Sequence, residues 1–134
     1  MFRKVEHIGI AVKNLAEANK LFHELSELEL IKTEEVEREG VRTSFFQAGE
    51  TKIEFLEATS DDSPIARFIE KNGEGVHHIA FEVEDIEVES KRLQQKGFVL
   101  LSDEPKRGAD NKLILFLHPK STNRVLIELC QEII

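Results

Sequence analysis

Near its start the chain reads His7-Ile8-Gly9-Ile10-Ala11-Val12, and later it reads His78-Ile79-Ala80-Phe81-Glu82-Val83. A second segment returns in the same way, since Lys52-Ile53-Glu54-Phe55-Leu56-Glu57 corresponds to Leu126-Ile127-Glu128-Leu129-Cys130-Gln131. The offsets are close, with 71 residues between the histidines and 74 between the glutamates. The chain therefore contains an internal duplication that returns one histidine and one glutamate at matched points of two predicted strands.

The first half predicts the order strand, helix, strand, strand, strand. Alternating apolar residues mark the strands, and apolar residues at helical spacing mark the helix. Asn14 followed by Glu17 is a typical helix N-terminus. The predicted strands cover residues 5–12, 28–35, 41–48 and 52–57, and the helix follows Asn14.

The second half repeats this order after a linking helix that begins at Ser63-Pro64 and ends at Asn72-Gly73. Its predicted elements are strands over 76–83, 98–102, 113–117 and 124–129, a helix from Asp85 to Gly97, and an exposed loop over 103–111. We therefore predict one α+β domain over residues 1–134. Two tandem βαβββ modules, 1–60 and 74–134, are joined by the helix near 63–72 and form a cleft-shaped mixed β-sheet with helices outside.

Composition narrows the functional class. The chain is 40% hydrophobic and 33% charged, and no apolar run approaches the roughly 20 residues of a membrane-spanning helix. A net charge of −8, with basic residues scattered among acidic ones, disfavours nucleic acid as a partner. The single cysteine, Cys130, excludes an internal disulfide, and the first residues leave no room for a secretory signal. We therefore expect a cytoplasmic protein, with Cys130 as a small apolar residue on a buried strand.

The repeated residues predict a metal site. Glu54 and Glu128 each lie inside an apolar strand, where an unpaired carboxylate would be costly to bury. If the modules pack with approximate twofold symmetry, His7, Glu54, His78 and Glu128 offer two imidazoles and two carboxylates to one divalent cation. These donors suit Zn²⁺, Co²⁺, Ni²⁺, Mn²⁺ or Fe²⁺ better than Ca²⁺ or Mg²⁺. The alternative is that each histidine is a hydrogen-bonded core residue and each glutamate faces water at a strand edge.

The other histidines have no counterpart in the opposite half. We expect His23, in a helix, and His118, in a turn before proline, to be solvated. His77 points to the face opposite His78, so we expect it to pack against or support the site without binding metal.

The duplicated pattern resembles the vicinal oxygen chelate (glyoxalase/bleomycin resistance/dioxygenase) superfamily, which has a glyoxalase-like fold. Within that superfamily the chain is similar to the methylmalonyl-CoA epimerase family from about His7 to Gln131. The His118-Pro119-Lys120-Ser121 turn is the most specific part of the likeness. The other similar segments are Asp62-Ser63-Pro64-Ile65-Ala66, Gly75-Val76-His77-His78-Ile79-Ala80, Asp103-Glu104-Pro105-Lys106 and Val125-Leu126-Ile127-Glu128-Leu129.

This resemblance implies an isomerase that interconverts (R)- and (S)-methylmalonyl-CoA by α-proton abstraction through a metal-stabilised enolate. It implies Co²⁺ as the favoured metal, a homodimer, and His7, Glu54, His78 and Glu128 as metal ligands. Glu128 matches a family position that is both ligand and base. Thr43 stands where some members carry a second glutamate base, and threonine cannot abstract an α-proton, so Glu54 is our candidate for the second base.

Two alternatives stay open. Glyoxalase I (lactoylglutathione lyase) uses the same four ligands to isomerise a hemithioacetal of methylglyoxal, and antibiotic-sequestering relatives bind small molecules without a metal. The acyl group could also be a close relative of methylmalonyl, such as ethylmalonyl. Several cations of the second half could contact the CoA phosphates, although each is equally well explained as a solvated side chain. They are Lys106, Arg107, Lys112, Lys120 and Arg124.

Overall fold

The computed structural model describes residues 1–134, and its internal contacts divide them into two units. The first unit is His7–His77, and the second unit is Met1–Glu6 together with His78–Ile134. Strands β1 (Lys4–Ala11) and β5 (Gly75–Glu82) each begin in one unit and end in the other. Each unit holds most of one βαβββ module.

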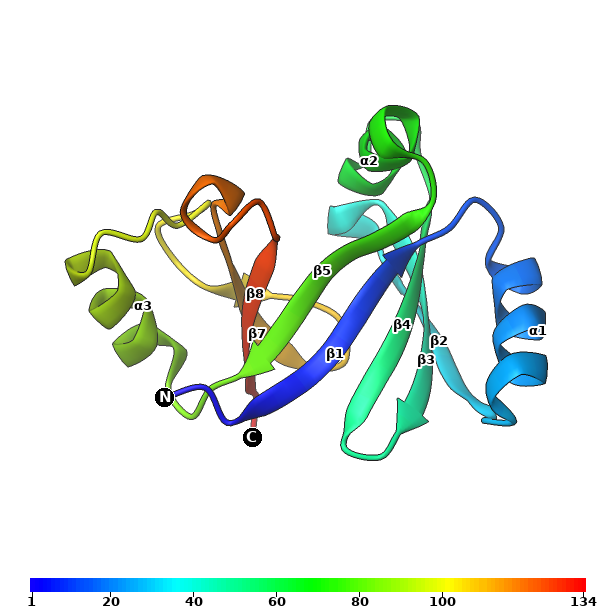
Figure 1. Cartoon of the computed structure of the whole chain (residues 1–134), viewed down its shortest axis with the longest axis horizontal. Coiled ribbons are helices and arrows are strands. Elements are labelled where there is room, and N and C mark those ends of the chain that lie inside the picture. The colour runs from blue at the N-terminus through cyan, green and yellow to red at the C-terminus, as the bar shows by residue number, and fades with distance from the viewer. The chain divides into compact units, whose positions relative to one another are not determined.

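The first unit contains a four-stranded mixed sheet in the order β2-β3-β4-β1 (Figure 1). Strands β2, β3 and β4 pair antiparallel, and β4 pairs parallel with β1. The remaining elements of this unit are α1 (Leu15–Ser26), β2 (Leu30–Val36), the 3₁₀ turn η1 (Glu37–Glu39), β3 (Val41–Ala48), β4 (Thr51–Ala58) and α2 (Pro64–Asn72).

Both helices of this unit begin where the sequence predicts. The Asn14 side chain accepts a hydrogen bond from the Glu17 backbone N–H at 3.0 Å, and Ser63 caps α2 in front of Pro64. The apolar stripe of α1 packs on one face of the sheet, where Phe22 contacts the rings of Phe46 and Phe55. This face is the hydrophobic core of the unit, so the opposite face of β1 and β4 is free to carry polar side chains.

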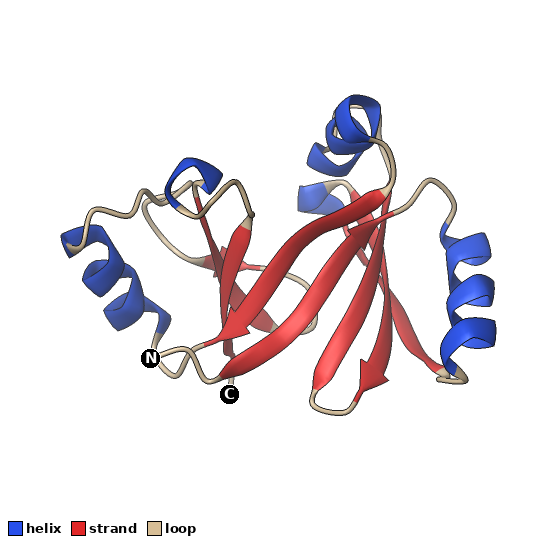
Figure 2. Ribbon diagram, viewed as in Figure 1, coloured by secondary structure: helices blue, strands red, loops and turns tan.

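In the second unit the strand order is β1-β5-β8-β7-β6. Figure 2 draws the strands in red and the helices in blue. The Arg3 N–H bonds to the Glu82 carbonyl at 2.9 Å and joins the start of β1 to β5. Strands β5 and β8 pair parallel, while β8, β7 and β6 pair antiparallel. The remaining elements are α3 (Ile86–Gln95), β6 (Lys106–Arg107), β7 (Lys112–Leu117), the 3₁₀ turn η2 (Pro119–Ser121) and β8 (Ile127–Glu132).

The core of the second unit lies between α3 and one face of its sheet. Asp85 caps α3, and the helix buries Ile86 and Leu93. The strand residues packed with them are Val83, Leu115, Leu117 and Leu129. Leu129 belongs to this core, so its neighbour Glu128 points to the opposite face of β8.

The prediction of a strand over 98–102 is wrong. Only Leu100 forms a bridge there, with Leu117, and the short strand β6 lies inside the stretch predicted as a loop. The chain turns away because the Ser102 hydroxyl bonds to the Glu104 carbonyl and Pro105 follows. The βαβββ order of the second module and the α+β class are nevertheless confirmed.

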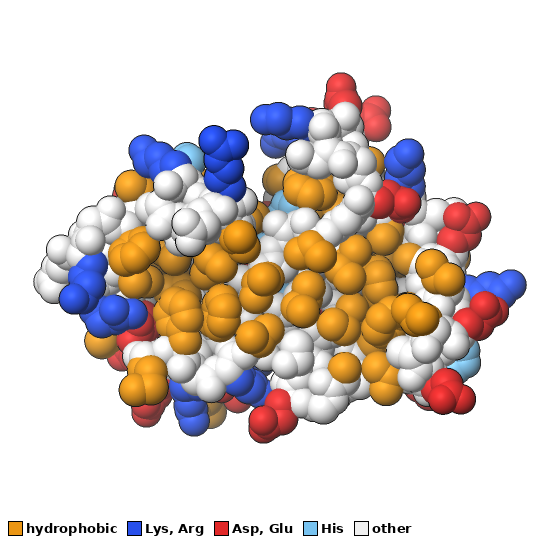
Figure 3. Space-filling view, in the orientation of Figure 1, with side chains coloured by type: hydrophobic (Ala, Val, Ile, Leu, Met, Phe, Trp, Pro, Cys, Tyr) orange, Lys and Arg blue, Asp and Glu red, His pale blue; other side chains and the backbone are white.

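Two surface properties follow from the structure. None of the helices combines the length and the hydropathy needed to cross a membrane. On the face drawn in Figure 3, lysine and arginine side chains form no continuous stripe of the kind that binds a phosphate backbone.

Candidate metal centre

The first unit pairs His7 with Glu54. Nδ1 of His7 lies 3.1 Å from Oε2 of Glu54, and only 7% and 5% of the two side chains are exposed. Parallel pairing of β1 and β4 places Gly9 opposite Glu54, two residues after the histidine on the same face. Glycine has no side chain, so it leaves room for the carboxylate to reach the imidazole.

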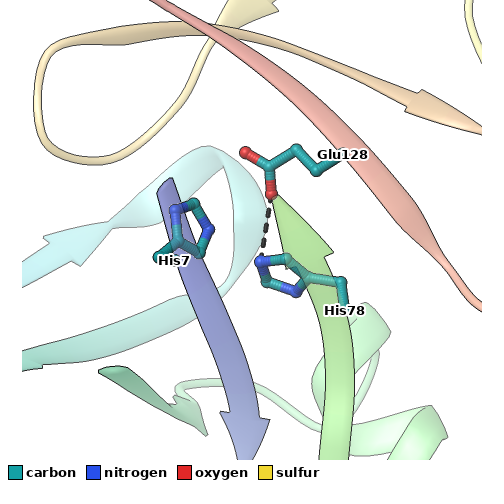
Figure 4. A group of neighbouring side chains, drawn as sticks. All are labelled: His7, His78 and Glu128. Atoms are coloured by element: carbon teal, nitrogen blue, oxygen red, sulfur yellow. Dashed lines mark ion pairs between the residues drawn. The ribbon is translucent and has the colours of Figure 1, made fainter. Parts of the chain in front are cut away.

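The second unit pairs His78 with Glu128. Nε2 of His78 lies 3.0 Å from Oε1 of Glu128, again with 7% and 5% of the side chains exposed. Figure 4 marks this ion pair with a dashed line and also labels His7. Ala80 lies opposite Glu128 in the parallel register, and the edge of the His78 ring faces Phe116 with the ring centroids 5.7 Å apart. The imidazole is therefore held between a carboxylate and an aromatic ring.

The duplication preserves contacts as well as residue types. In both units the small residue two positions after the histidine lies opposite the glutamate. Two kinds of hydrogen bond also recur, one from the residue after the histidine strand and one from the first residue of the following helix. They are Val12 N–H to Leu56 O and Val83 N–H to Cys130 O, then Leu15 N–H to Glu57 and Ile86 N–H to Gln131.

The donor chemistry of each pair fits a divalent metal ion. Two ligands of one ion, each about 2.0–2.2 Å from it, are separated by roughly 3.0–3.5 Å. The nitrogen–oxygen distances of 3.1 and 3.0 Å are in that range. Both pairs belong to groups of buried histidine and acidic side chains suited to holding a metal ion. Each unit thus supplies one imidazole and one carboxylate, and the binding of all four to one ion stays a prediction.

Thr43 lies on the same face of the first unit's sheet as Glu54. It is 1% exposed on β3, two residues before Phe45, which pairs directly with Glu54. The position that the resemblance compares with a glutamate base is therefore a buried hydroxyl in this chain.

The remaining histidines have structural contacts. The ring of His77 meets Phe68 of α2 edge-on at 4.9 Å, so the expected packing role is confirmed. Nδ1 of His23 lies 2.8 Å from the Leu28 carbonyl oxygen, and about half of the side chain is exposed. Nδ1 of His118 accepts the Lys120 N–H and stabilises the turn before β8.

The structure corrects the placement of Lys112 among the solvated loop cations. Lys112 begins β7, its side chain is 7% exposed, and its Nζ lies 4.0 Å from Oε2 of the buried Glu6. Lys112, Ile114 and Phe116 are two residues apart along β7, so their side chains lie on the same face of the strand. This alternation with apolar residues was the feature of the sequence that indicated a buried Lys112. It is therefore not available to a CoA phosphate.

Cys130 is fully buried on β8, as expected. Burial raises the pKa of its thiol far above the ordinary value, and the carboxylates of Glu128 and Glu6 act in the same direction. The thiol is therefore protonated and unreactive in the folded protein.

This chain belongs to the glyoxalase/bleomycin resistance protein/dioxygenase superfamily, whose family model matches residues 6–116. The glyoxalase-like fold implied by the resemblance is thereby confirmed.

Particular relatives share nearly the whole chain. It is 42% identical to the ethylmalonyl-CoA/methylmalonyl-CoA epimerase of Cereibacter sphaeroides, and the match covers 98% of this chain and 99% of that protein. Two solved structures each match with a TM-score of 0.93 and 35% identity, over 98% of this chain and 96% of theirs. One is a variant of Streptomyces coelicolor methylmalonyl-CoA epimerase with 2-nitronate-propionyl-CoA, and the other is a methylmalonyl-CoA epimerase with methylmalonyl-CoA and NH₄⁺.

Proposed function

We propose that this protein is a metal-dependent epimerase that interconverts (R)- and (S)-methylmalonyl-CoA. The observation that carries the proposal is the duplicated, buried His–Glu pair in a chain whose relatives with this name match almost its full length. The ethylmalonyl-CoA/methylmalonyl-CoA epimerase among them makes ethylmalonyl-CoA a second acyl substrate to test.

His7, Glu54, His78 and Glu128 would hold the metal ion, with Co²⁺ as the first candidate and Zn²⁺, Ni²⁺ or Mn²⁺ as the others. When bound, the ion supplies Lewis-acid stabilisation of the negative charge that develops on the thioester oxygen. The burial of both pairs supports this assignment, because electrostatic stabilisation is stronger where water is excluded.

Inversion requires one group to remove the α-proton and another to return a proton on the opposite face of the planar intermediate. Glu128 and Glu54 are assigned these two roles, one from each unit, and each carboxylate can shuttle a proton. The buried hydroxyl of Thr43 does not replace either of them.

The assembly and compartment are part of the proposal. Leu21 and Leu25 lie one turn apart on α1 and are 67% and 77% exposed, which supports a homodimer that covers apolar surface. The chain has one cysteine, Cys130, which is free and buried, and this supports a cytoplasmic location.

A coupled assay tests the proposal directly. Purified protein loaded with Co²⁺ is expected to epimerise methylmalonyl-CoA and to leave a mixture of methylglyoxal and glutathione unchanged. Turnover of the hemithioacetal with none of the CoA ester would identify a glyoxalase instead. Failure to bind any divalent metal, by elemental analysis after dialysis, would favour a metal-free binding protein.

A further inference from the structure

A buried ion pair joins two strands of the second unit that are not neighbours. Nζ of Lys112 on β7 lies 4.0 Å from Oε2 of Glu6 on β1, and the two side chains are 7% and 2% exposed. Nζ of Lys112 also lies 3.4 Å from Oε1 of Glu132, which is 72% exposed. Because burying two charges removes both from water, the stability gained from such a pair is small and does not explain its presence.

The pair spans an unusual distance across the sheet. Strands β5 and β8 lie between β1 and β7, so a flat sheet would separate β1 from β7 by three strand spacings, or roughly 14 Å. Side chains that stand perpendicular to a flat sheet do not meet across that gap. The contact therefore requires these strands to curl toward the face that carries Lys112.

That face is the one that carries the candidate metal ligand Glu128. Lys112 and Phe116 are four residues apart on β7, so their side chains lie on the same face of the sheet. Phe116 pairs directly with Glu128 of β8, so Glu128 lies on that face too. At the other end of the ion pair, Glu6 is the residue before His7. A movement of the Glu6 backbone is passed on to His7, because the two residues share a peptide bond within one strand.

We propose that the Glu6–Lys112 ion pair is a brace that positions His7 for metal binding. This inference rests on the proposed function. Lys112 is a positioning residue, since it acts through Glu6, which precedes His7 on β1 and whose carboxylate belongs to the same group of buried acidic and histidine side chains as His7. An ion pair is favourable only over a small range of distances between its two charged groups, so it fixes how strongly the sheet curls. Apolar side chains can pack against each other in several arrangements and fix the curl less closely.

The charge-neutral double variant E6Q/K112M separates positioning from stability. It removes the ion pair without leaving one buried charge alone, so we expect its thermal unfolding temperature to stay near that of the wild type. We expect its Kd for Co²⁺, measured by chelator competition, to rise at least about tenfold, as for lost supporting contacts in other metal sites. The visible absorption of bound Co²⁺ should also change, because it reports ligand geometry.

An exposed pair of the first unit provides the matched control. Nη2 of Arg42 lies 2.6 Å from Oε1 of Glu35, and both side chains are more than 40% exposed. The E35Q/R42M variant, like E6Q/K112M, replaces a glutamate by glutamine and a cationic residue by methionine. It is expected to keep the wild-type Co²⁺ affinity and spectrum.

The possible results separate the two proposals. An E6Q/K112M protein with the wild-type Co²⁺ affinity and spectrum overturns the positioning role, whether or not its unfolding temperature falls. A wild-type protein that binds no Co²⁺ overturns the proposed metal site and this role together. The single variant K112M leaves the buried Glu6 carboxylate without its cation and is expected to fold poorly, so the double variant carries the test.

Discussion

Nε2 of His78 lies 3.0 Å from Oε1 of Glu128, and the parallel register of β5 and β8 creates this contact by placing the small Ala80 opposite the glutamate. The first unit reproduces the arrangement with His7, Gly9 and Glu54. A donor pair made twice by one strand geometry gives each unit half of a four-ligand set. The proposed function depends on the two halves binding the same ion.

Loss of any one of the four ligands should weaken metal binding strongly. Loss of a supporting contact around a metal typically costs 10–100-fold in affinity, so replacing His7 or His78 by alanine should cost more than about 100-fold. Isothermal titration with Co²⁺ measures the effect. Glu24→Gln, an exposed carboxylate on α1, is the control and should bind nearly normally. If only the variants of one unit lost Co²⁺ affinity, the result would contradict one ion shared by the ligands of both units.

Gly40→Ala should destabilise the first unit more than Gly49→Ala. Both glycines have a left-handed backbone, with φ of +63° and +65°, which costs a non-glycine residue about 1–2 kcal/mol. A Cβ at Gly40 would also lie 2.8 Å from Cβ of Ser63, whereas a Cβ at Gly49 meets nothing within 4 Å. We expect Gly40→Ala to lower the free energy of unfolding by about 3 kcal/mol or more. Equal losses in urea titrations of the two variants would show that the Ser63 contact relaxes freely.

Much of the fold can be predicted from the duplicated sequence, because several of its elements depend only on neighbouring residues. Asn14 and Ser63 are local caps that need only neighbouring residues, so both helix starts are predicted correctly. Strand alternation and the matched repeat identify the four residues, whereas their pairing within each module comes from the parallel registers of β1 with β4 and β5 with β8. The four-ligand site itself depends on how distant segments are placed, which no local pattern specifies.

The errors have the same origin. The strand predicted over 98–102 has adequate β propensity, but it is reduced to one bridge at Leu100, and after the Leu101 N–H bond to the Phe116 carbonyl the chain turns toward Pro105. Lys112 looks like a surface lysine until the curl of the sheet brings Glu6 to its ammonium group. Curl is a property of several strands together, so residues that exploit it are not recognised from one strand.

Cys130 should be inert toward thiol reagents in the folded protein. Burial raises the pKa of its thiol, so neither access nor the thiolate needed for alkylation is present at pH 8. Mass spectrometry after iodoacetamide treatment should find no modification under native conditions and full modification in guanidinium chloride. Rapid native modification would indicate that β8 opens readily.

Glu89→Gln should remove part of the stability that depends on pH. The Arg92 guanidinium holds the pKa of the Glu89 carboxyl below its ordinary value through a 2.8 Å hydrogen bond. The folded protein therefore favours the ionised form, and this contribution is present above the unfolded pKa of about 4.3 and is lost as the pH falls through the folded pKa. We expect the variant to lose about 0.5–1 kcal/mol at pH 7 and to approach the wild type in acid. A loss that does not change with pH would refute the linkage.

Exchange of the α-proton of methylmalonyl-CoA with deuterated water tests the central claim most directly. The wild-type protein with Co²⁺ should introduce deuterium at the α-carbon, as followed by NMR, because Glu54 and Glu128 carry the proton to and from solvent. The E54Q/E128Q double variant should reduce this exchange to the uncatalysed rate. Exchange that continues at the wild-type rate in the double variant would contradict the assignment of the two glutamates as the bases of an epimerase.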